Sequence, residues 1–204
     1  MRFYIADCHF YHAALNLYMD KRGFNSVEEM NAFMIQQWNN VVRKNDEVVI
    51  LGDFSWAGAH ETELILEQLN GKKLLITGNH DRYLKDKTFD TSKYFAWVKP
   101  YEELSDNNRK VILSHYPMPF YNGQYRLDEN GNAKTYMLYG HIHNTHDQQL
   151  MDQFIQTIQQ TKVKDPGGLM RTIPCQCINV FTQYSNYKPL TLDQWIENDA
   201  KRKK

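Results

Sequence analysis

Five short apolar runs in this chain are each followed by residues able to bind a metal ion, and this repeated unit constrains the fold most. In the clearest example, the Leu-Leu-Ile run at residues 74–76 leads after one threonine into Gly78-Asn79-His80-Asp81. A run of apolar residues predicts a strand buried on both faces, and a glycine behind it lets the backbone turn sharply. We therefore expect an amide, an imidazole and a carboxylate to lie together at the end of this strand.

The same unit occurs four more times along the chain. Apolar runs at residues 3–6, 48–51, 111–114 and 136–139 are followed by Asp7-Cys8-His9, Gly52-Asp53, His115 and Gly140-His141-Ile142-His143. In open α/β sheets, ligands bind in the crevice outside the carboxyl ends of the strands. The five predicted strands would therefore deliver one set of candidate metal ligands to a single site: Asp7, His9, Asp53, Asn79, His115, His141 and His143.

Helices are predicted between the strands of the first half of the chain. Ser26 with Glu29 three residues later forms a capping box, and apolar residues at helical spacing continue to Val41. A second helix is predicted over residues 61–69, because Asn70-Gly71 suits a left-handed C-terminal cap. The order β, α, β, α, β implies a parallel sheet with right-handed crossovers.

The second half of the chain predicts shorter elements. A strand is expected at residues 95–98, and turns at 106–108 and 130–132 favour antiparallel pairing in a second sheet packed on the first. Residues 116–134 predict an ordered loop or hairpin flap, and residues 147–162 a helix stopped by Pro166-Gly167-Gly168. A last strand at 178–181 precedes a short helix at 191–198. We expect one domain over residues 1–204, because this length can bury a full core.

Charge and composition limit the partners. Lys+Arg and Asp+Glu both total 24, so the chain has no global basic field of the kind that draws proteins to nucleic acid. No apolar run approaches the ~20 residues that a bilayer requires, and Met1-Arg2 leads directly into the first strand. We therefore expect a cytoplasmic protein with no membrane partner.

The three cysteines are predicted to be structural. None belongs to a C-x-x-C motif of the kind found in zinc and redox sites. Side chains alternate along a strand, so Cys8 should point into packing when Asp7 and His9 point into the cleft. Cys175 and Cys177 share one face of a later strand and are expected to be buried thiols.

The donor atoms of the predicted site indicate which metals it would hold. Carboxylate, imidazole and amide donors without thiolates suit manganese, iron, zinc or nickel ions. Seven candidates exceed the needs of one ion, whereas two ions that share a bridging carboxylate account for the number. Two ions ~3.5–4 Å apart clamp the attacking and leaving oxygens of a displacement at phosphorus, and water held between them becomes the nucleophile.

These blocks, in this order, resemble the five blocks of the calcineurin-like metallophosphoesterases, and the resemblance covers about Ile5 to His143. Residues 178–180 resemble the strand that closes the second sheet of that family. The resemblance implies an α/β (α+β) fold, a β-sandwich of two mixed sheets flanked by α-helices. The spacing of His12 after His9 resembles a branch of small bacterial and phage-type members.

The resemblance also implies a role for each residue of the site. Asp7, His9 and His143 would hold one metal, Asn79, His115 and His141 would hold the other, and Asp53 would bridge them. His80 would stand near the leaving group and be oriented by Asp81.

Three residues beside the blocks are candidates for binding the substrate. Gly52-Asp53 is followed by Phe54-Ser55-Trp56, where many members carry a further aspartate and an arginine. Arg82 is a candidate replacement for that arginine, and a simple surface residue is the alternative. His12 and Tyr116 are candidates to line the pocket.

Three hypotheses of function follow. The first is a dimetal phosphodiesterase or phosphatase acting on a small phosphate ester; aromatic residues between Tyr116 and Tyr125 slightly favour a nucleotide-like substrate. The second is a metal-dependent nuclease, for which the sequence offers no basic groove or added nucleic-acid-binding domain. The third is a non-catalytic scaffold, which should show eroded blocks, whereas His80 and every ligand are present.

Overall fold

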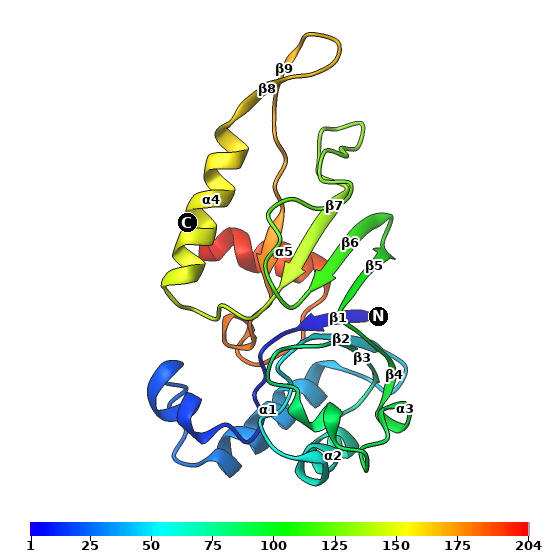
Figure 1. The fold of residues 1–204 in the computed structure, drawn as a ribbon, viewed down its shortest axis with the longest axis vertical. Helices are drawn as coiled ribbons and strands as arrows, with labels where there is room; N and C mark the ends of the chain where they lie inside the picture. Colours follow the sequence, from blue (N-terminus) through cyan, green and yellow to red (C-terminus); the bar gives the residue numbers. More distant parts are fainter. Residues whose placement is uncertain (204) are drawn as a thin grey trace.

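The computed structural model describes residues 1–203 and contains two four-stranded sheets, each with helices on its outer side (Figure 1). The first sheet is parallel throughout, in the order β1-β2-β3-β4. Its strands are β1 (Arg2–Ile5), β2 (Glu47–Leu51), β3 (Lys72–Ile76) and β4 (Phe95–Lys99). Helices α1 (Val27–Val41) and α2 (Ala59–Gln68) connect the first three strands. The predicted β, α, β, α, β order is therefore confirmed.

The second sheet has the order β10-β7-β6-β5. Its strands are β5 (Tyr101–Asp106), β6 (Arg109–Ser114), β7 (Thr135–Tyr139) and β10 (Cys177–Asn179). Only β5 and β6, joined by a tight turn, are antiparallel, while β6 with β7 and β7 with β10 are parallel. The sequence predicted antiparallel pairing for the other strands of this sheet as well, and that prediction is wrong. The strands are parallel because long connections return the chain to the same end of the sheet. One of these connections contains helix α4 (His146–Gln160).

Three apolar layers hold the sheets and helices together. Tyr4, Leu51 and Ile76 of the first sheet pack against Val111, Leu138 and Ile178 of the second, so the sheets form a sandwich. The outer face of the first sheet packs on α1 and α2. The outer face of the second packs on α4. The expected α/β sandwich flanked by helices is confirmed.

The helix caps follow the sequence signals. Ser26 Oγ accepts the backbone N–H of Glu29 at 3.1 Å, while the Glu29 carboxylate accepts from the backbone of Asn25 rather than Ser26. Thr191 caps helix α5 (Leu192–Arg202) in a complete capping box with Gln194. The remaining short helices are η1 (Leu15–Met19), η2 (Arg82–Lys85), α3 (Thr91–Tyr94) and η3 (Thr182–Ser185).

A hairpin that the sequence did not predict projects at one end of the molecule (Figure 1). It consists of β8 (Lys162–Lys164) and β9 (Met170–Thr172). Helix α4 already ends at Gln160, so the residues 166–168 predicted to stop it lie instead in the hairpin turn. The two strands are short and exposed, and they therefore lack the buried apolar run that marks the other strands.

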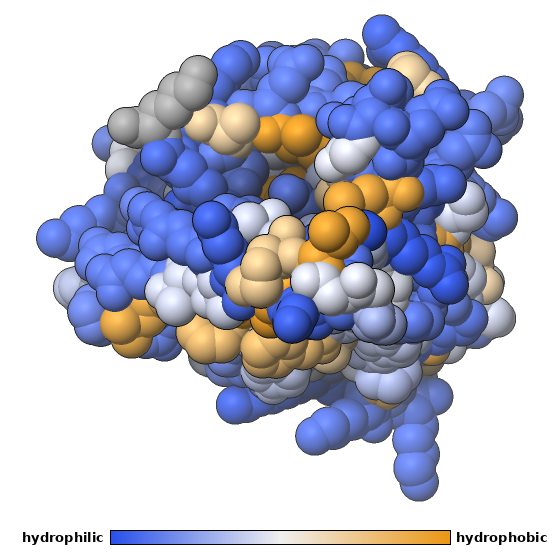
Figure 2. Space-filling model, turned by 90° about the horizontal axis from the view of Figure 1, so that it is seen from above, coloured by the Kyte–Doolittle hydropathy of each residue, from blue (hydrophilic) through white to orange (hydrophobic). Residues whose placement is uncertain are grey.

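Seen from the end that carries the hairpin, the surface is mostly polar, and hydrophobic residues gather near the middle of this face (Figure 2). Across residues 1–203, no helix combines the length and apolar character needed to cross a bilayer.

The three cysteines are buried as predicted. Cys8 lies in the layer between the first sheet and α1, and Cys175 and Cys177 lie under α4 with their sulfur atoms 3.8 Å apart. Burial raises the pKa of the Cys8 thiol far above its ordinary value, so the thiol stays protonated.

We expect each of these cysteines to be replaceable by alanine without loss of metal. Each Cys→Ala variant loses packing and should cost about 1 kcal/mol or more in the free energy of unfolding. Urea denaturation measures this cost, and elemental analysis measures the metal content. A variant that loses one metal equivalent would show that its thiol is a ligand.

Candidate metal centre

The seven predicted ligands converge at the carboxyl ends of strands from both sheets. Two groups have their ligand atoms within 4.8 Å of one another: Asp7, His9 and His143 in one, and Asp53, His115 and His141 in the other. The first group joins the end of β1 to the loop after β7. The second joins the loops that follow β2, β6 and β7. The structure thus brings together residues that the sequence places on five separate strands.

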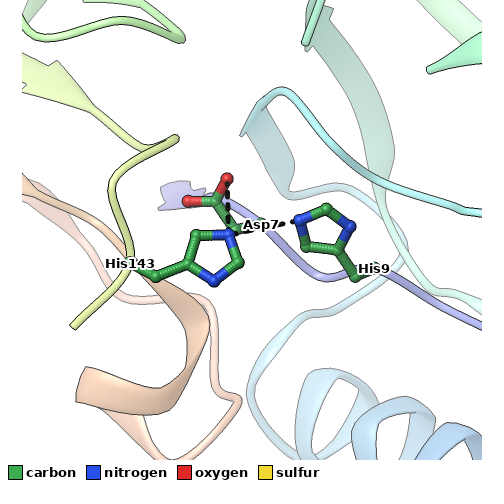
Figure 3. A group of neighbouring side chains, drawn as sticks. All are labelled: Asp7, His9 and His143. Carbon is green, nitrogen blue, oxygen red and sulfur yellow. Dashed lines mark hydrogen bonds and ion pairs between the residues drawn. The ribbon is translucent and has the colours of Figure 1, made fainter. Parts of the chain in front are cut away.

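The first group fits a metal ion (Figure 3). Nε2 of His9 lies 3.2 Å from Nε2 of His143, which in turn lies 3.7 Å from Oδ1 of Asp7. Two imidazole nitrogens and a carboxylate oxygen therefore face one region of space. A cation accepts lone pairs from all three atoms, and this donor set suits zinc, manganese, iron or nickel.

Asp53 lies between the two groups. Its Oδ2 atom is 3.5 Å from Nε2 of His9 and 3.5 Å from Nε2 of His115. Asn79 joins the second group, with Oδ1 3.0 Å from Nε2 of His115. The other ring nitrogen of His115 lies 2.8 Å from the carbonyl oxygen of Leu51, which directs Nε2 toward the centre. One carboxylate is thus placed to serve both groups.

The backbone at the site is held in an uncommon conformation. Five of the candidate ligands have positive φ angles, a region that non-glycine residues rarely adopt: Asp7 (56°), His9 (49°), Asp53 (52°), His141 (72°) and His143 (46°). Each such residue costs on the order of 1–3 kcal/mol and persists only where the surroundings hold it. Such strain clusters at functional sites, and here it turns the side chains out of the strand ends into one cleft.

Two glycines allow the loops to approach one another closely. A Cβ atom at Gly140 would lie 2.5 Å from Oδ2 of Asp7, and a Cβ atom at Gly78 would overlap Asp53. The backbone N–H of His141 donates to both Asp7 oxygens at 3.0 Å. The glycines before Asn79 and His141 are therefore needed for the contact between loops.

The buried carboxylates require positive charge. Burial raises the pKa of the Asp7 carboxyl to about 6, against the opposing effect of His143 and His115. Burial alone would lower the pKa of His115, but Asp53 and Asp7 outweigh it and raise that pKa to about 9. A divalent ion can supply this charge in place of the His115 proton, so the electrostatics also fit a metal.

Comparison with known proteins identifies the family. The chain matches the profile of the calcineurin-like phosphoesterase superfamily domain over residues 3–180. The chain belongs to this superfamily. It is 33% identical over 191 residues to the uncharacterized protein MJ1445 of Methanocaldococcus jannaschii, covering 93% of this chain and 85% of that protein.

Two further matches agree with this assignment. The gene 66 protein of Mycobacterium phage L5 is 29% identical over 168 residues, covering 69% of this chain and 76% of that protein. The crystal structure of the protein of unknown function AQ665 from Aquifex aeolicus has a TM-score of 0.65 at 21% identity, covering 97% of this chain and 98% of that one. The last match shows a shared fold.

The predicted contact between Asp81 and His80 is wrong. The Asp81 carboxylate accepts the backbone N–H groups of Phe54 at 2.8 Å, Gly78 at 2.7 Å and Asp53 at 3.1 Å. Nδ1 of His80 is buried and has no hydrogen-bond partner among residues 1–203. Buried backbone donors in two adjacent turns need an acceptor, and Asp81 folds back to supply it. Asp81 therefore positions the loop that carries Asp53.

The three candidate substrate-binding residues occupy different places. His12 lines a cavity beside the centre, together with His80. Tyr116 is exposed and packs its ring 4.5 Å from that of His141. Arg82 is also exposed, with its guanidinium 5.5 Å from the ring of Trp56, and it does not line this cavity. For Arg82, the structure agrees with the alternative of a surface residue.

Asp20 and Arg22 are part of the site, and the sequence did not reveal them. Oδ1 of Asp20 accepts a hydrogen bond from Nδ1 of His143 at 2.7 Å, and Oδ2 accepts two from Arg22 at 2.9 and 3.0 Å. The fully buried Arg22 side chain also donates to the carbonyl oxygens of Asp7 and Cys8. The only signal was a pair of opposite charges in a polar loop, 123 residues from His143.

The Asp20 carboxylate remains ionised at neutral pH. Burial acts to raise its pKa, but the hydrogen bond with His143 and the charge of Arg22 outweigh burial and lower it. The ionised carboxylate holds a proton on Nδ1 of His143, which leaves the lone pair of Nε2 directed at the centre.

We expect Asp20→Asn to lower the affinity for metal by roughly 10–100-fold. One Asp20 oxygen accepts from His143 and the other accepts from Arg22. An asparagine side chain has only one oxygen, so in either orientation its NH₂ group would face the N–H donor of one of these two residues. Competition with a chromophoric chelator measures the affinity, and circular dichroism checks the fold. Asp147→Asn, which alters an exposed aspartate, is the matched control. Unchanged metal affinity in a folded Asp20→Asn variant would contradict the role of Asp20.

Proposed function

We propose that this protein is a dimetal-dependent phosphoesterase that hydrolyses small phosphate esters, with phosphodiesters preferred. The observation that carries the proposal is the position of Asp53, 3.5 Å from a histidine of each ligand group. Membership of the calcineurin-like phosphoesterase superfamily supports the reaction class. The intact and convergent ligand set argues against a non-catalytic scaffold.

The residues divide into two metal sites. Asp7, His9 and His143 would hold one ion, Asn79, His115 and His141 the other, and Asp53 would bridge them. Two bound ions lower the pKa of water and withdraw charge from the oxygens of a phosphate ester. The protein keeps the donor atoms in place through Asp20, Arg22 and Asp81, which bind the ligand loops from behind.

His80 is the proposed general acid for the leaving oxygen. Its ring lines the same cavity as His9 and Asp53, with its centroid 5.7 Å from that of His9. Its backbone N–H donates to Oδ1 of Asp53 at 2.8 Å, which ties the residue to the centre. A proton from an imidazole helps an alcohol to leave, because an alkoxide is a poor leaving group.

The walls of this cavity do not favour the nuclease hypothesis. Among the described residues that line it, none is a lysine or an arginine. A nucleic-acid strand carries phosphates on both sides of the scissile bond and is bound by a basic groove. A small ester has no such requirement.

The bridging role of Asp53 predicts that one substitution affects both metals. The wild-type protein should bind close to two ions per chain, and Asp53→Asn should lower metal content and hydrolysis of bis-p-nitrophenyl phosphate together. Elemental analysis and a colorimetric assay measure the two quantities, with Asp147→Asn as the control. Two retained metals at full activity would overturn the bridging assignment.

The acid role of His80 predicts a loss that depends on the leaving group. His80→Ala should keep both metals and lose roughly 10²–10⁴-fold in rate on an alkyl ester. It should lose much less on a p-nitrophenyl ester, whose leaving group needs no proton. His60→Ala, at an exposed histidine, is the control. An equal loss on both esters would indicate charge stabilisation instead, and a loss of metal would make His80 a ligand.

A further inference from the structure

A cavity of about 420 Å³ opens beside the candidate metal centre. Its inner side consists of candidate ligands and His80. Its outer wall, which no part of the proposed chemistry uses, is made largely of apolar and aromatic side chains: His12, Ala14, Leu15, Tyr18, Met19 and Trp56. The volume lies within the range of about 300–1,000 Å³ that is typical of small-molecule sites.

Trp56 presents a half-exposed aromatic face next to the proposed acid. Trp56 as a residue is 42% exposed, and its ring centroid lies 4.7 Å from that of His80 and 3.9 Å from that of His12. The loop beneath it is held by the backbone: the N–H of Trp56 donates to Phe10, and the N–H of Phe10 donates to Phe54. The indole is therefore a pre-positioned surface at the place where the leaving group must lie.

Another part of the outer wall comes from the single π-helical turn η1. Tyr18 and Met19 are 73% and 60% exposed, although the segment itself is well anchored. The buried Asn16 side chain exchanges two hydrogen bonds with the backbone of Phe24, and the N–H of Leu15 donates to Nδ1 of His12. Large side chains held in water beside a cavity mark a binding surface, and π-turns occur frequently at functional sites.

The charges of the cavity restrict the ligand further. Asp53 is the only carboxylate among the described lining residues, and it belongs to the metal centre. The outer wall therefore offers stacking and apolar contact, and the Arg82 guanidinium, 5.5 Å from the Trp56 ring, lies outside the cavity lining. Tryptophan gives the strongest aromatic stacking, and methionine sulfur also contacts aromatic rings favourably.

We infer that the alcohol released by this enzyme is a neutral aromatic alcohol, which stacks on Trp56 and is covered by Tyr18 and Met19. The inference rests on the proposed phosphoesterase function and names its substrate class. His80, 4.7 Å from Trp56, then lies beside the oxygen that carries this aromatic group away.

Three methyl phosphodiesters test the inference in the metal-loaded protein. Their second alcohols are benzyl, 4-sulfonatobenzyl and 2-methoxyethyl, so that ring and charge vary separately. The kcat/KM of the wild type should be highest for the benzyl ester. Trp56→Ala should lower it roughly tenfold for that ester and less than twofold for the methoxyethyl ester. Trp56→Phe should retain most of the preference for the benzyl ester.

Binding measured without turnover gives an independent readout. The Kd of benzyl(methyl)phosphinate, which has no P–O–C bond to hydrolyse, is measured by calorimetry and should rise roughly tenfold in Trp56→Ala, while the Kd of methyl(2-methoxyethyl)phosphinate should change little. Tyr18→Ala should weaken the aromatic ligand in the same direction. Tyr125→Ala removes an exposed tyrosine that does not line the cavity, and it should leave both Kd values unchanged.

The outcomes separate the two proposals. Failure to hydrolyse any of the three esters with metals bound would overturn the proposed function, and equal Kd values for the two phosphinates would overturn the aromatic site. Hydrolysis of all three esters at equal kcat/KM, or an equal loss on all of them in Trp56→Ala, would leave a phosphoesterase without the inferred specificity.

Discussion

The end of β1 is hydrogen-bonded to both sheets, and the site depends on this junction. The backbone of Ala6 pairs with Val180 and Thr182, after β10, while the N–H of Asp7 donates to Gly52, after β2. Ala6 and Asp7 thus directly follow a strand of the first sheet, and their backbones are hydrogen-bonded to segments that follow strands of both sheets. The carboxyl ends of β2 and β3 on one side and of β6 and β7 on the other can then reach the same cleft. Without this junction, the members of each ligand group would stay apart, because each group draws residues from both sheets.

The buried charges at that junction are stabilised from behind by groups that never face the cleft. Arg22 binds the carbonyl oxygens of the first ligand block and neutralises Asp20, and Asp81 binds the N–H groups of the next two loops. Arg22 donates to backbone carbonyl oxygens, whereas Asp81 accepts from backbone N–H groups. Each side chain thus matches the kind of backbone group that its loop leaves without a partner. This support helps the Asp7 and Asp53 loops to keep positive φ angles, which an isolated turn would relax.

The sequence allowed prediction of which residues converge at the candidate metal centre, because each of them is local to a strand end. Asn79 and His141 directly follow a glycine that follows an apolar run, so short patterns carried the information. Partners across the fold were not predictable in this way: Asp20 meets His143 over 123 residues, and no local pattern encodes that contact. Asp81 was misassigned because its carboxylate accepts from backbone N–H groups of other residues and not from the ring of its sequence neighbour His80. Strand direction in the second sheet depends on the connections, which apolar patterns do not specify.

The segment between β1 and α1 combines two tasks that the sequence did not suggest. The flap at residues 116–134 was expected to supply aromatic contacts to the substrate, but its Phe120 packs on Phe154 of α4, and the Tyr121 hydroxyl accepts a hydrogen bond from the backbone N–H of Gln176. The segment after β1 instead places Tyr18 and Met19 on the cavity wall and then Asp20 and Arg22 behind the ligands. The last exposed residue of η1 is directly followed by the aspartate that orients His143. A substrate bound as we propose would therefore contact a wall that one short stretch of backbone joins to the residues behind the candidate metal centre.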